Sequence, residues 1–237
     1  MPQRQVPATN RLLAALPLRD RKRFLASAEL VELKFSDVLS IPGEPIRHVY
    51  FPTDSLVSLV ATVDGSSGLE VGLVGNEGVL GISLMLGVEE SPLHALVQGA
   101  GGAVRMKAAP FRRELAESIA LQSGLNRYLY VSMSELAQTA ACTRYHLLES
   151  RLARWLMTTG DRAHSDEFLL THELLAHRLG VRRVGVTTAA GALQKRGLIR
   201  YSRGHITILD RTGLEAAACE CYRAGQDMHD RILRQVS

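Results

Sequence analysis

The spacing of apolar residues changes several times along the chain. Between residues 8 and 30, apolar residues recur at helical intervals around Pro17, which predicts a short, interrupted helical segment. From about residue 31, short runs rich in Val, Leu, Ile, Phe and Tyr alternate with turn residues: VELKF, IRHVYF, SLVSLVATV, LEVGLV, HALVQ and AVRM. Glycine-rich turns separate these runs, for example at residues 64–68, 75–78 and 99–102. Short strands with such turns predict an antiparallel barrel or jelly roll.

The segment from about residue 108 to 160 has helical periodicity instead. Its seam of positions steps by four and three residues: Leu125, Leu129, Ser132, Leu136, Thr139 and Thr143. Such a seam packs either on the chain's own barrel or against the same helix of a second subunit, and we favour dimerisation. The next run places its apolar residues on one face, which we expect to pack the following unit: Leu148, Leu152, Trp155 and Leu156.

Residues 170–209 indicate two short helices around a glycine turn, followed by a basic hairpin. Ala176 lies four residues before Gly180, and Val186 lies six residues after it. Two steeply crossing helices need a small residue at their contact, a glycine at the turn and an apolar residue that holds the second helix. This is the helix-turn-helix pattern of DNA-binding proteins, whose second helix enters the major groove. A buried helical hairpin with the same spacing is the alternative.

Charge favours the DNA-binding interpretation. Seven cations occur between residues 178 and 203 with no Asp or Glu among them: Arg178, Arg182, Arg183, Lys195, Arg196, Arg200 and Arg203. A solvated helical face normally mixes signs, so this density predicts a surface that faces phosphates. We expect Arg183 to contact a base edge with help from Thr187 or Thr188. The residues expected at phosphates are Thr171, Arg182, Arg200 and Arg203, with His205 a weaker candidate.

Composition sets broader limits. The chain has 237 residues, of which 46% are hydrophobic and 22% charged, and its formal net charge is +4. These values are ordinary for a soluble globular protein of one large or two medium domains. The first 13 residues lack a secretory signal pattern, and no run approaches the roughly 20 apolar residues of a membrane helix. We therefore expect a cytoplasmic protein with no membrane partner.

Catalytic and metal-binding motifs are absent from the sequence. The pair Cys219 and Cys221 lacks C-x-x-C spacing, and Cys142 is the only other cysteine, so we expect reduced, packed thiols and no metal or cofactor. An iron–sulfur cluster normally requires four thiolates. The chain also lacks H-x-H, G-x-S-x-G, P-loop and H-E-x-x-H patterns. An enzyme is not expected.

The order of strand-rich barrel, long helix and winged helix-turn-helix resembles the Crp/Fnr family of bacterial transcription regulators. The resemblance covers nearly the whole chain, and its most specific stretches are IPGEPIRHVYFP, ESRLARWL and LTHELLAHRLGVRR…LQKRGLIRYSRGHITILD. It implies an α+β fold in three parts: a cyclic-nucleotide-binding-like β-barrel over residues 1–118, a long dimerisation helix over 119–144 and a winged helix-turn-helix domain over 145–237. It also implies a homodimer on pseudo-palindromic double-stranded DNA, an effector pocket in the barrel and, for an activator, RNA polymerase as a partner.

Departures from the family pattern limit what the resemblance implies. The candidate effector pocket keeps its turn residues and one histidine: Gly75, Glu77, Gly78, Gly81 and His94. Residues 74–98 contain no Arg or Lys, and Ser91-Pro92-Leu93-His94 stands where the family places an Arg and a hydroxyl residue. A buried phosphate without a fixed cation is costly, so we predict that cyclic AMP is not a tight ligand and leave the effector unidentified.

The second of the two predicted helices departs as well. Arg183 matches the family's first Arg, whereas Val184 replaces a Glu and Thr188 replaces an Arg. We therefore expect a different half-site, in which Val184 contacts a thymine methyl. The alternative from another class is a barrel-type ligand-binding or docking module whose winged helix contacts protein instead of DNA.

Overall fold

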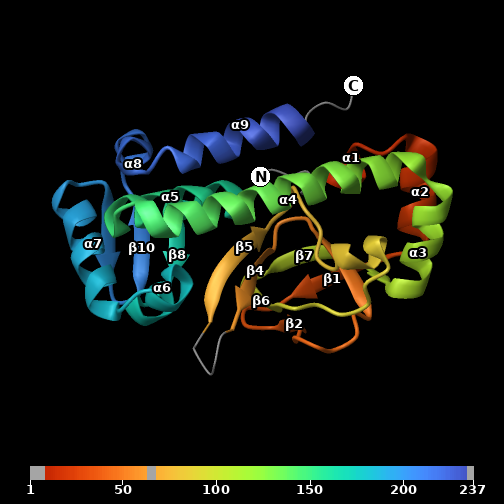
Figure 1. Ribbon diagram of the computed structural model, residues 1–237, viewed down its shortest axis with the longest axis horizontal. Coiled ribbons are helices and arrows are strands. Elements are labelled where there is room, and N and C mark those ends of the chain that lie inside the picture. Colours follow the sequence, from red (N-terminus) through yellow and green to blue (C-terminus); the bar gives the residue numbers. More distant parts are fainter. Residues whose placement is uncertain (1–8, 63–67, 234–237) are drawn as a thin grey trace, which may run out of the picture. The chain divides into compact units, whose positions relative to one another are not determined.

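The computed structural model describes residues 9–62 and 68–233 (Figure 1). These residues form two compact units: the first holds those up to 60 and 73–131, and the second holds 61–72 and 132–233. The change from one unit to the other lies inside the long helix α4 (Ile119–Tyr145). The division into three parts, with boundaries at 118 and 144, stays a prediction. Residues 1–8 and most of the turn expected at 64–68 lie outside the described residues.

The first unit begins with two short helices, α1 (Arg11–Ala14) and α2 (Leu18–Ala26), separated by Pro17 as expected. Asn10 caps α1, because its side-chain oxygen accepts the N–H groups of Leu12 and Leu13. Its side-chain nitrogen donates to the carbonyl oxygens of Pro52 and Gly78. This single buried amide therefore fixes the start of α1 onto the strand region.

The strand-rich prediction is confirmed as two antiparallel sheets that share one core. The strands are β1 (Glu29–Leu33), β2 (Val38–Ser40), β3 (His48–Pro52), β4 (Leu56–Ala61), β5 (Leu69–Val74), β6 (His94–Gly99) and β7 (Gly101–Lys107), with a 3-10 helix η1 (Ile82–Leu86). One sheet has the order β1-β7-β3 and the other β2-β6-β4-β5. Leu33 and Tyr50 of the first sheet pack in one cluster with Val57 and Val97 of the second. Two sheets facing across an apolar core are a jelly-roll arrangement.

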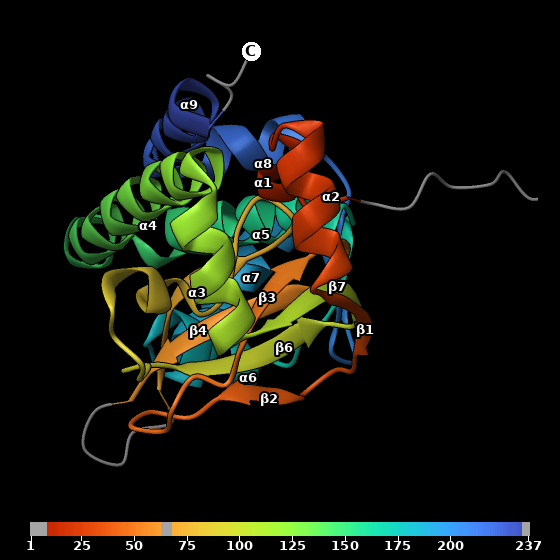
Figure 2. The same ribbon diagram turned by 90° about the vertical axis from the view of Figure 1, so that its right-hand side faces the viewer.

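Aromatic rings attach helices to the first sheet. Phe24 of α2 meets Phe51 of β3 edge to face, with ring centroids 5.2 Å apart. Phe111 of α3 (Ala108–Glu117) also lies beside Phe51, at 6.3 Å. All three side chains are fully buried. Figure 2 shows α2 and α3 beside the strands of this sheet.

The second unit consists of helices that pack around one apolar core, together with a small three-stranded sheet. Its elements after α4 are α5 (Leu148–Ala163), β8 (Glu167–Leu169), α6 (His172–Leu179), α7 (Arg183–Lys195), β9 (Ile199–Ser202), β10 (His205–Ile208), α8 (Arg211–Ala217) and α9 (Cys221–Leu233). As predicted, Leu152, Trp155 and Leu156 of α5 enter this core. The sheet has the order β8-β10-β9, and β8 was not among the predicted strands. Among the described residues, none of the helices combines the length and apolar composition that crossing a membrane requires.

A partly buried ionic cluster joins three helices of this unit. Glu135 of α4 accepts from Arg162 of α5 at 2.6 Å and lies 2.7 Å from the imidazole of His229 on α9. Burial alone would raise the pKa of Glu135, but the charges and hydrogen bonds of Arg162 and His229 outweigh it and lower this pKa to about 2. The carboxylate is therefore charged at neutral pH and holds α9 in place.

Candidate DNA-binding surface

The helix-turn-helix forms where the sequence predicts it. Thr171 caps α6, since its hydroxyl oxygen accepts the N–H of Leu174 at 3.2 Å. α6 ends at Gly180, which has a φ of +63°, in the left-handed region that favours glycine. α7 begins shortly afterwards at Arg183, and Arg182 before it makes no side-chain capping bond.

Packing compensates for the weak local preference of α7. Val186, Ala189, Ala190 and Leu193 form its buried face. A Cβ atom at Gly185 would lie 2.9 Å from the Cδ2 of Leu148, so glycine lets α7 approach the start of α5 closely. The helix is thus held by the core of its own unit, as the low helix propensity of its glycines requires.

The opposite face of α7 and the hairpin after it are open to solvent. Every residue that the sequence assigns to DNA is exposed: Thr171, Arg182, Arg183, Thr187, Thr188, Arg200, Arg203 and His205. Val184 is 76% exposed beside Arg183. An apolar side chain this exposed on a basic helix suits contact with a base methyl group. These eight residues lie at the N-terminal caps of α6 and α7, on α7 itself and on the hairpin of one compact unit, whose elements are labelled in Figure 1.

The wing is a tight hairpin of β9 and β10. Ser202 pairs with His205, and the two residues between them turn the chain. Arg203 and Gly204 have φ angles of +50° and +82°. Positive φ at both central positions is the geometry of a type I′ turn, which matches the twist of the two strands. The turn leaves the Arg203 side chain exposed at the tip of the hairpin.

His172 links α7 to the wing. Its imidazole stacks on the ring of Tyr201, with centroids 4.2 Å apart and planes 10° from parallel. Its Nδ1 lies 3.0 Å from the hydroxyl of Thr187 on α7. Tyr201 is in turn held at both ends, by its N–H to the side-chain oxygen of Gln194 and by its hydroxyl to the carbonyl of Leu170. Sequence reasoning missed this arrangement, because no pattern relates positions 172 and 201.

Two of the seven cations counted in the sequence do not face solvent freely. Arg178 is buried and donates to the Glu70 carboxylate at 2.8 Å, and Trp155 donates to the same carboxylate at 2.7 Å. Arg196 pairs with Glu149 at 2.8 Å on the surface. The expectation that Arg178 adds to the basic surface is wrong, because this side chain is buried. Its position on α6, two residues before the turn, points it into the core of the unit.

The seam proposed for dimerisation is divided in the structure. Leu125 is fully buried within its own chain and is not accessible to a second subunit. Leu129, Ser132 and Thr139 are half-buried, and Leu136 is 44% exposed. The more exposed apolar positions of α4 are Tyr130 at 54% and Met133 at 62%. The exposed apolar positions 130 and 133 are therefore each one residue after the predicted seam positions 129 and 132, whereas Leu136 belongs to both sets.

The candidate effector residues lie in the first unit and contact their own chain. Glu77 is buried and accepts the N–H of Gly75 at 3.1 Å. Gly78 lies against Tyr128 of α4 so closely that a Cβ atom would stand 2.3 Å from the tyrosine hydroxyl. Gly81 adopts a φ of +89°, and His94, at the start of β6, is half-buried. This turn thus packs directly on the long helix.

Sequence reasoning also missed a cluster of metal-ligand side chains in the second unit. Cys142, His146, Cys219 and Cys221 offer ligand atoms that all lie within 4.8 Å of one another. Packed thiols without a metal were expected, because the two cysteine positions near the C-terminal end were compared only with a C-x-x-C pattern. The available signal was the i, i+4 spacing of Cys142 and His146 within the segment of helical periodicity, although the predicted boundary at 144 falls between them.

Comparisons with known proteins agree with this architecture. A family profile described as a Crp-like helix-turn-helix domain matches residues 150–217. The transcriptional regulator SdrP of Thermus thermophilus is 28% identical over 198 residues, which cover 80% of this chain and 94% of that protein.

Solved structures show the same fold. A Crp/Fnr-family transcriptional regulator from Thermus thermophilus aligns with a TM-score of 0.68 and 25% identity, covering 80% of this chain and 98% of the other. A putative regulator of the same family from Eubacterium rectale aligns with a TM-score of 0.69 and 17% identity, covering 87% and 96%. The chain thus carries a Crp-like helix-turn-helix domain and has the fold of Crp/Fnr-family transcriptional regulators.

Proposed function

We propose that this chain acts as a homodimer that binds a pseudo-palindromic site on double-stranded DNA, with α7 of each subunit in the major groove. The observation that carries the proposal is the face of α7 opposite the core. There Arg183, Val184 and Thr188 are all exposed on a helix whose other side is fully packed. A helix held in this way presents its side chains to a groove without rearrangement of its backbone.

Each exposed residue has a chemical role in this proposal. Arg183 donates to the O6 and N7 of a guanine, and Val184 contacts a thymine methyl beside it. Thr188 reaches a neighbouring base edge, while Thr187 is oriented by His172. The remaining exposed residues grip phosphates on either side of the groove: Thr171, Arg182, Arg200, Arg203 and His205. Because valine stands at 184 in place of the Glu of the family pattern, the half-site differs from that of relatives with Arg-Glu.

Dimerisation through α4 is part of the proposal. Tyr130, Met133 and Leu136 form an exposed apolar stripe on this helix, and exposed Ala137 and Ala140 continue it with small side chains. Small and apolar positions at heptad-like spacing suit a helix pair, in which each stripe covers the other. Two-fold symmetry then places two copies of α7 on two half-sites.

The jelly roll is proposed as the sensor part, with an effector that is not cyclic AMP. Glu77 already accepts a backbone N–H, and residues 74–98 supply no Arg or Lys to neutralise a phosphate. Gly78 lies against Tyr128 of α4. A ligand that moves this turn therefore acts directly on the proposed dimerisation helix. For an activator, RNA polymerase is the further partner.

The test is selection of bound sequences from a random pool of double-stranded DNA with the purified chain at near-physiological salt. We expect an inverted repeat. Arg183→Ala should lower affinity by about 1–3 kcal/mol per half-site and relax preference at one base pair. Arg196→Ala is the matched control, because this arginine is paired with Glu149 at the far end of α7. An unchanged sequence preference in Arg183→Ala would contradict the assignment of α7, and absence of any DNA binding would favour a protein-docking module.

A further inference from the structure

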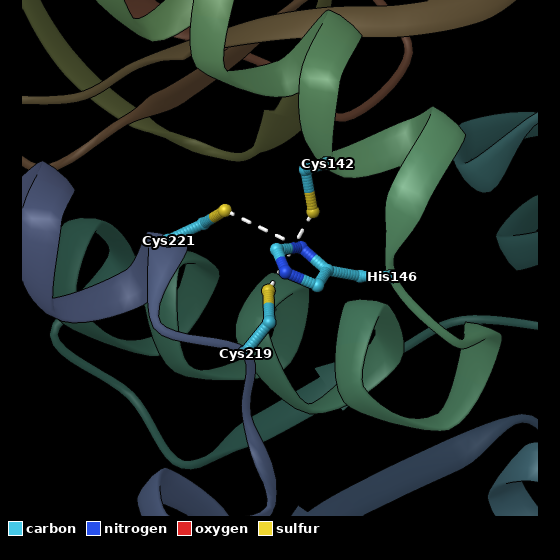
Figure 3. Close-up of side chains that lie close together, drawn as sticks. All are labelled: Cys142, His146, Cys219 and Cys221. Atoms are coloured by element: carbon cyan, nitrogen blue, oxygen red, sulfur yellow. Dashed lines mark hydrogen bonds between the residues drawn. The ribbon is translucent and has the colours of Figure 1, made fainter.

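Two segments of the second unit, residues 142–146 and 219–221, meet at the Cys142–His146–Cys219–Cys221 cluster. Cys142 lies near the C-terminal end of α4, and His146 follows this helix directly. Cys219 precedes α9 and Cys221 is its first residue. Figure 3 shows the three sulfur atoms and the imidazole of His146 pointing toward one common point. The three thiols are buried and the imidazole is half-buried.

Two of the ligand–ligand distances are close to the edges of a metal tetrahedron, and all of them are within 4.8 Å. The sulfurs of Cys142 and Cys219 lie 3.5 Å apart, and the sulfur of Cys221 lies 3.5 Å from Nδ1 of His146. Ligands at the usual Zn–S and Zn–N bond lengths in a tetrahedron stand about 3.8 Å apart for two sulfurs and about 3.6 Å for sulfur and nitrogen. A cluster of several iron atoms would need its ligands farther apart. The set therefore fits one small ion.

The surroundings also suit a bound cation with thiolate ligands. Nε2 of His146 lies 4.0 Å from a carboxylate oxygen of Glu220. This is beyond hydrogen-bond distance, but it places a carboxylate on the side of the ring where metal-bound histidines commonly have an outer partner. Arg151 and Arg154 of α5 interact electrostatically with the Cys142 thiol. Three thiolates and a neutral imidazole around a divalent ion carry one net negative charge, which these guanidinium groups offset. The Nε of Arg154 is buried with no hydrogen-bond partner among the described residues.

We propose that these four side chains form a closed, four-coordinate site for a thiophilic divalent ion, with Zn²⁺ as the ion that the three-sulfur, one-nitrogen donor set favours. Four protein ligands leave no open position, so the site is structural and not catalytic. Bound Zn²⁺ joins the end of α4 to the start of α9 at the point where α4 leads into α5. It thereby fixes the connection between the helix proposed for dimerisation and the helix-turn-helix unit.

The first test measures metal content and coordination in the full chain. Protein is stripped with a chelator under reducing conditions and then titrated with Zn²⁺ alone or with Co²⁺ as a spectroscopic probe. We expect one Zn²⁺ per chain, and for Co²⁺ the intense visible absorption of tetrahedral thiolate coordination. Weak, octahedral-type Co²⁺ absorption without stoichiometric Zn²⁺ binding would overturn the proposal. The proposal would also be overturned if these thiols formed a Cys142–Cys219 disulfide and bound no metal ion.

The second test uses matched histidine variants. His146→Asn removes a ligand, whereas His164→Asn alters an exposed histidine in a left-handed position that asparagine tolerates. Loss of an outer-shell partner weakens metal binding roughly 10- to 100-fold. We expect the loss of a direct ligand in His146→Asn to weaken Zn²⁺ binding by at least this factor, and His164→Asn to leave the affinity unchanged. Equal affinities would overturn the proposal. If His146→Asn fails to fold, the rate of thiol modification in the unaltered chain decides: Zn²⁺ should slow it for all three cysteines, and equal rates with and without Zn²⁺ refute the site.

Discussion

His172 of α6 stacks on Tyr201 of the wing, with ring centroids 4.2 Å apart, and so joins the two parts of the candidate DNA-binding surface. Because the same imidazole lies 3.0 Å from the hydroxyl of Thr187, it also contacts α7. Gln194 of α7 accepts the backbone N–H of Tyr201 at 2.7 Å. The helices α6 and α7 and the wing are thus held together by His172, Tyr201 and Gln194, none of which is among the residues assigned to DNA.

Removal of this imidazole should loosen the wing. We expect His172→Ala to destabilise the chain by about 1 kcal/mol, since stacked aromatic pairs contribute about 0.5–1.5 kcal/mol beyond burial. His177→Ala, the other histidine of α6, is the control. Urea unfolding of both variants measures the difference, and hydrogen exchange of the wing amides locates it. Equal stability of the two variants would contradict a role for the stack.

Acidification should have a related effect. Burial lowers the pKa of His172 below its usual value of 6.5, and the charge of Arg183 lowers it further. As the pH falls, His172 is therefore protonated in the unfolded chain before it is protonated in the folded chain. The stabilising contribution of the neutral imidazole is present above pH 6.5 and is lost below it. The difference in Tm between the unaltered chain and His172→Ala should shrink from about pH 7.5 to about pH 5.5. A constant difference would contradict the assignment.

The wing tip offers a test of phosphate binding. Arg203 has a φ of +50°, so alanine there would strain the turn, whereas asparagine tolerates this conformation. Arg203→Asn should weaken binding to all DNA sequences alike and reduce the slope of log affinity against log salt by about 0.9 for each phosphate that is no longer neutralised. Binding measured at several salt concentrations on specific and random duplexes checks both points. A change confined to one base pair would indicate base readout instead.

Local signals were enough to predict much of the fold. Alternating apolar runs located β3 to β7, and Gly180 with Ala176 and Val186 located the helix-turn-helix. These features depend on residues close together in the chain, where spacing and turn chemistry are decisive. β2 and β8 have only three residues each and were missed, because so short a run carries no period.

Contacts between distant segments could not be predicted in the same way. Arg178 counts as a surface cation until the fold places it 2.8 Å from Glu70, 108 positions earlier in the chain. Cys142 and Cys219 are 77 residues apart, so neither suggests a site alone. The exposure of the residues assigned to DNA on α7 could be predicted. The apolar period of this helix identifies its buried face, and therefore also the face that is open to solvent.

The buried ion pair of Arg178 and Glu70 should contribute more to the free energy of unfolding than the surface pair of Arg196 and Glu149. Arg178→Ala leaves the Glu70 carboxylate buried without this cation, which typically costs about 3–5 kcal/mol. Arg196→Ala removes an exposed partner of Glu149 and should cost at most about 1 kcal/mol. Urea unfolding of the two variants makes the comparison. Similar losses of stability would mean that Arg178 is solvated after all and belongs to the basic surface.

The predicted seam on α4 combined buried positions, which stabilise the first unit, with exposed positions that a second subunit could contact. Met133 is 62% exposed on α4, whereas Leu125 is fully buried in the first unit. Met133→Glu should therefore give a folded monomer, because two like charges would face each other in a paired stripe. Leu125→Ala should instead lower stability by about 2–5 kcal/mol, through the cavity it leaves, and keep the dimer. Light scattering gives the mass of each variant, and unfolding gives its stability. A dimeric Met133→Glu, or a monomeric but fully stable Leu125→Ala, would show that the subunits pair through the buried seam or another surface.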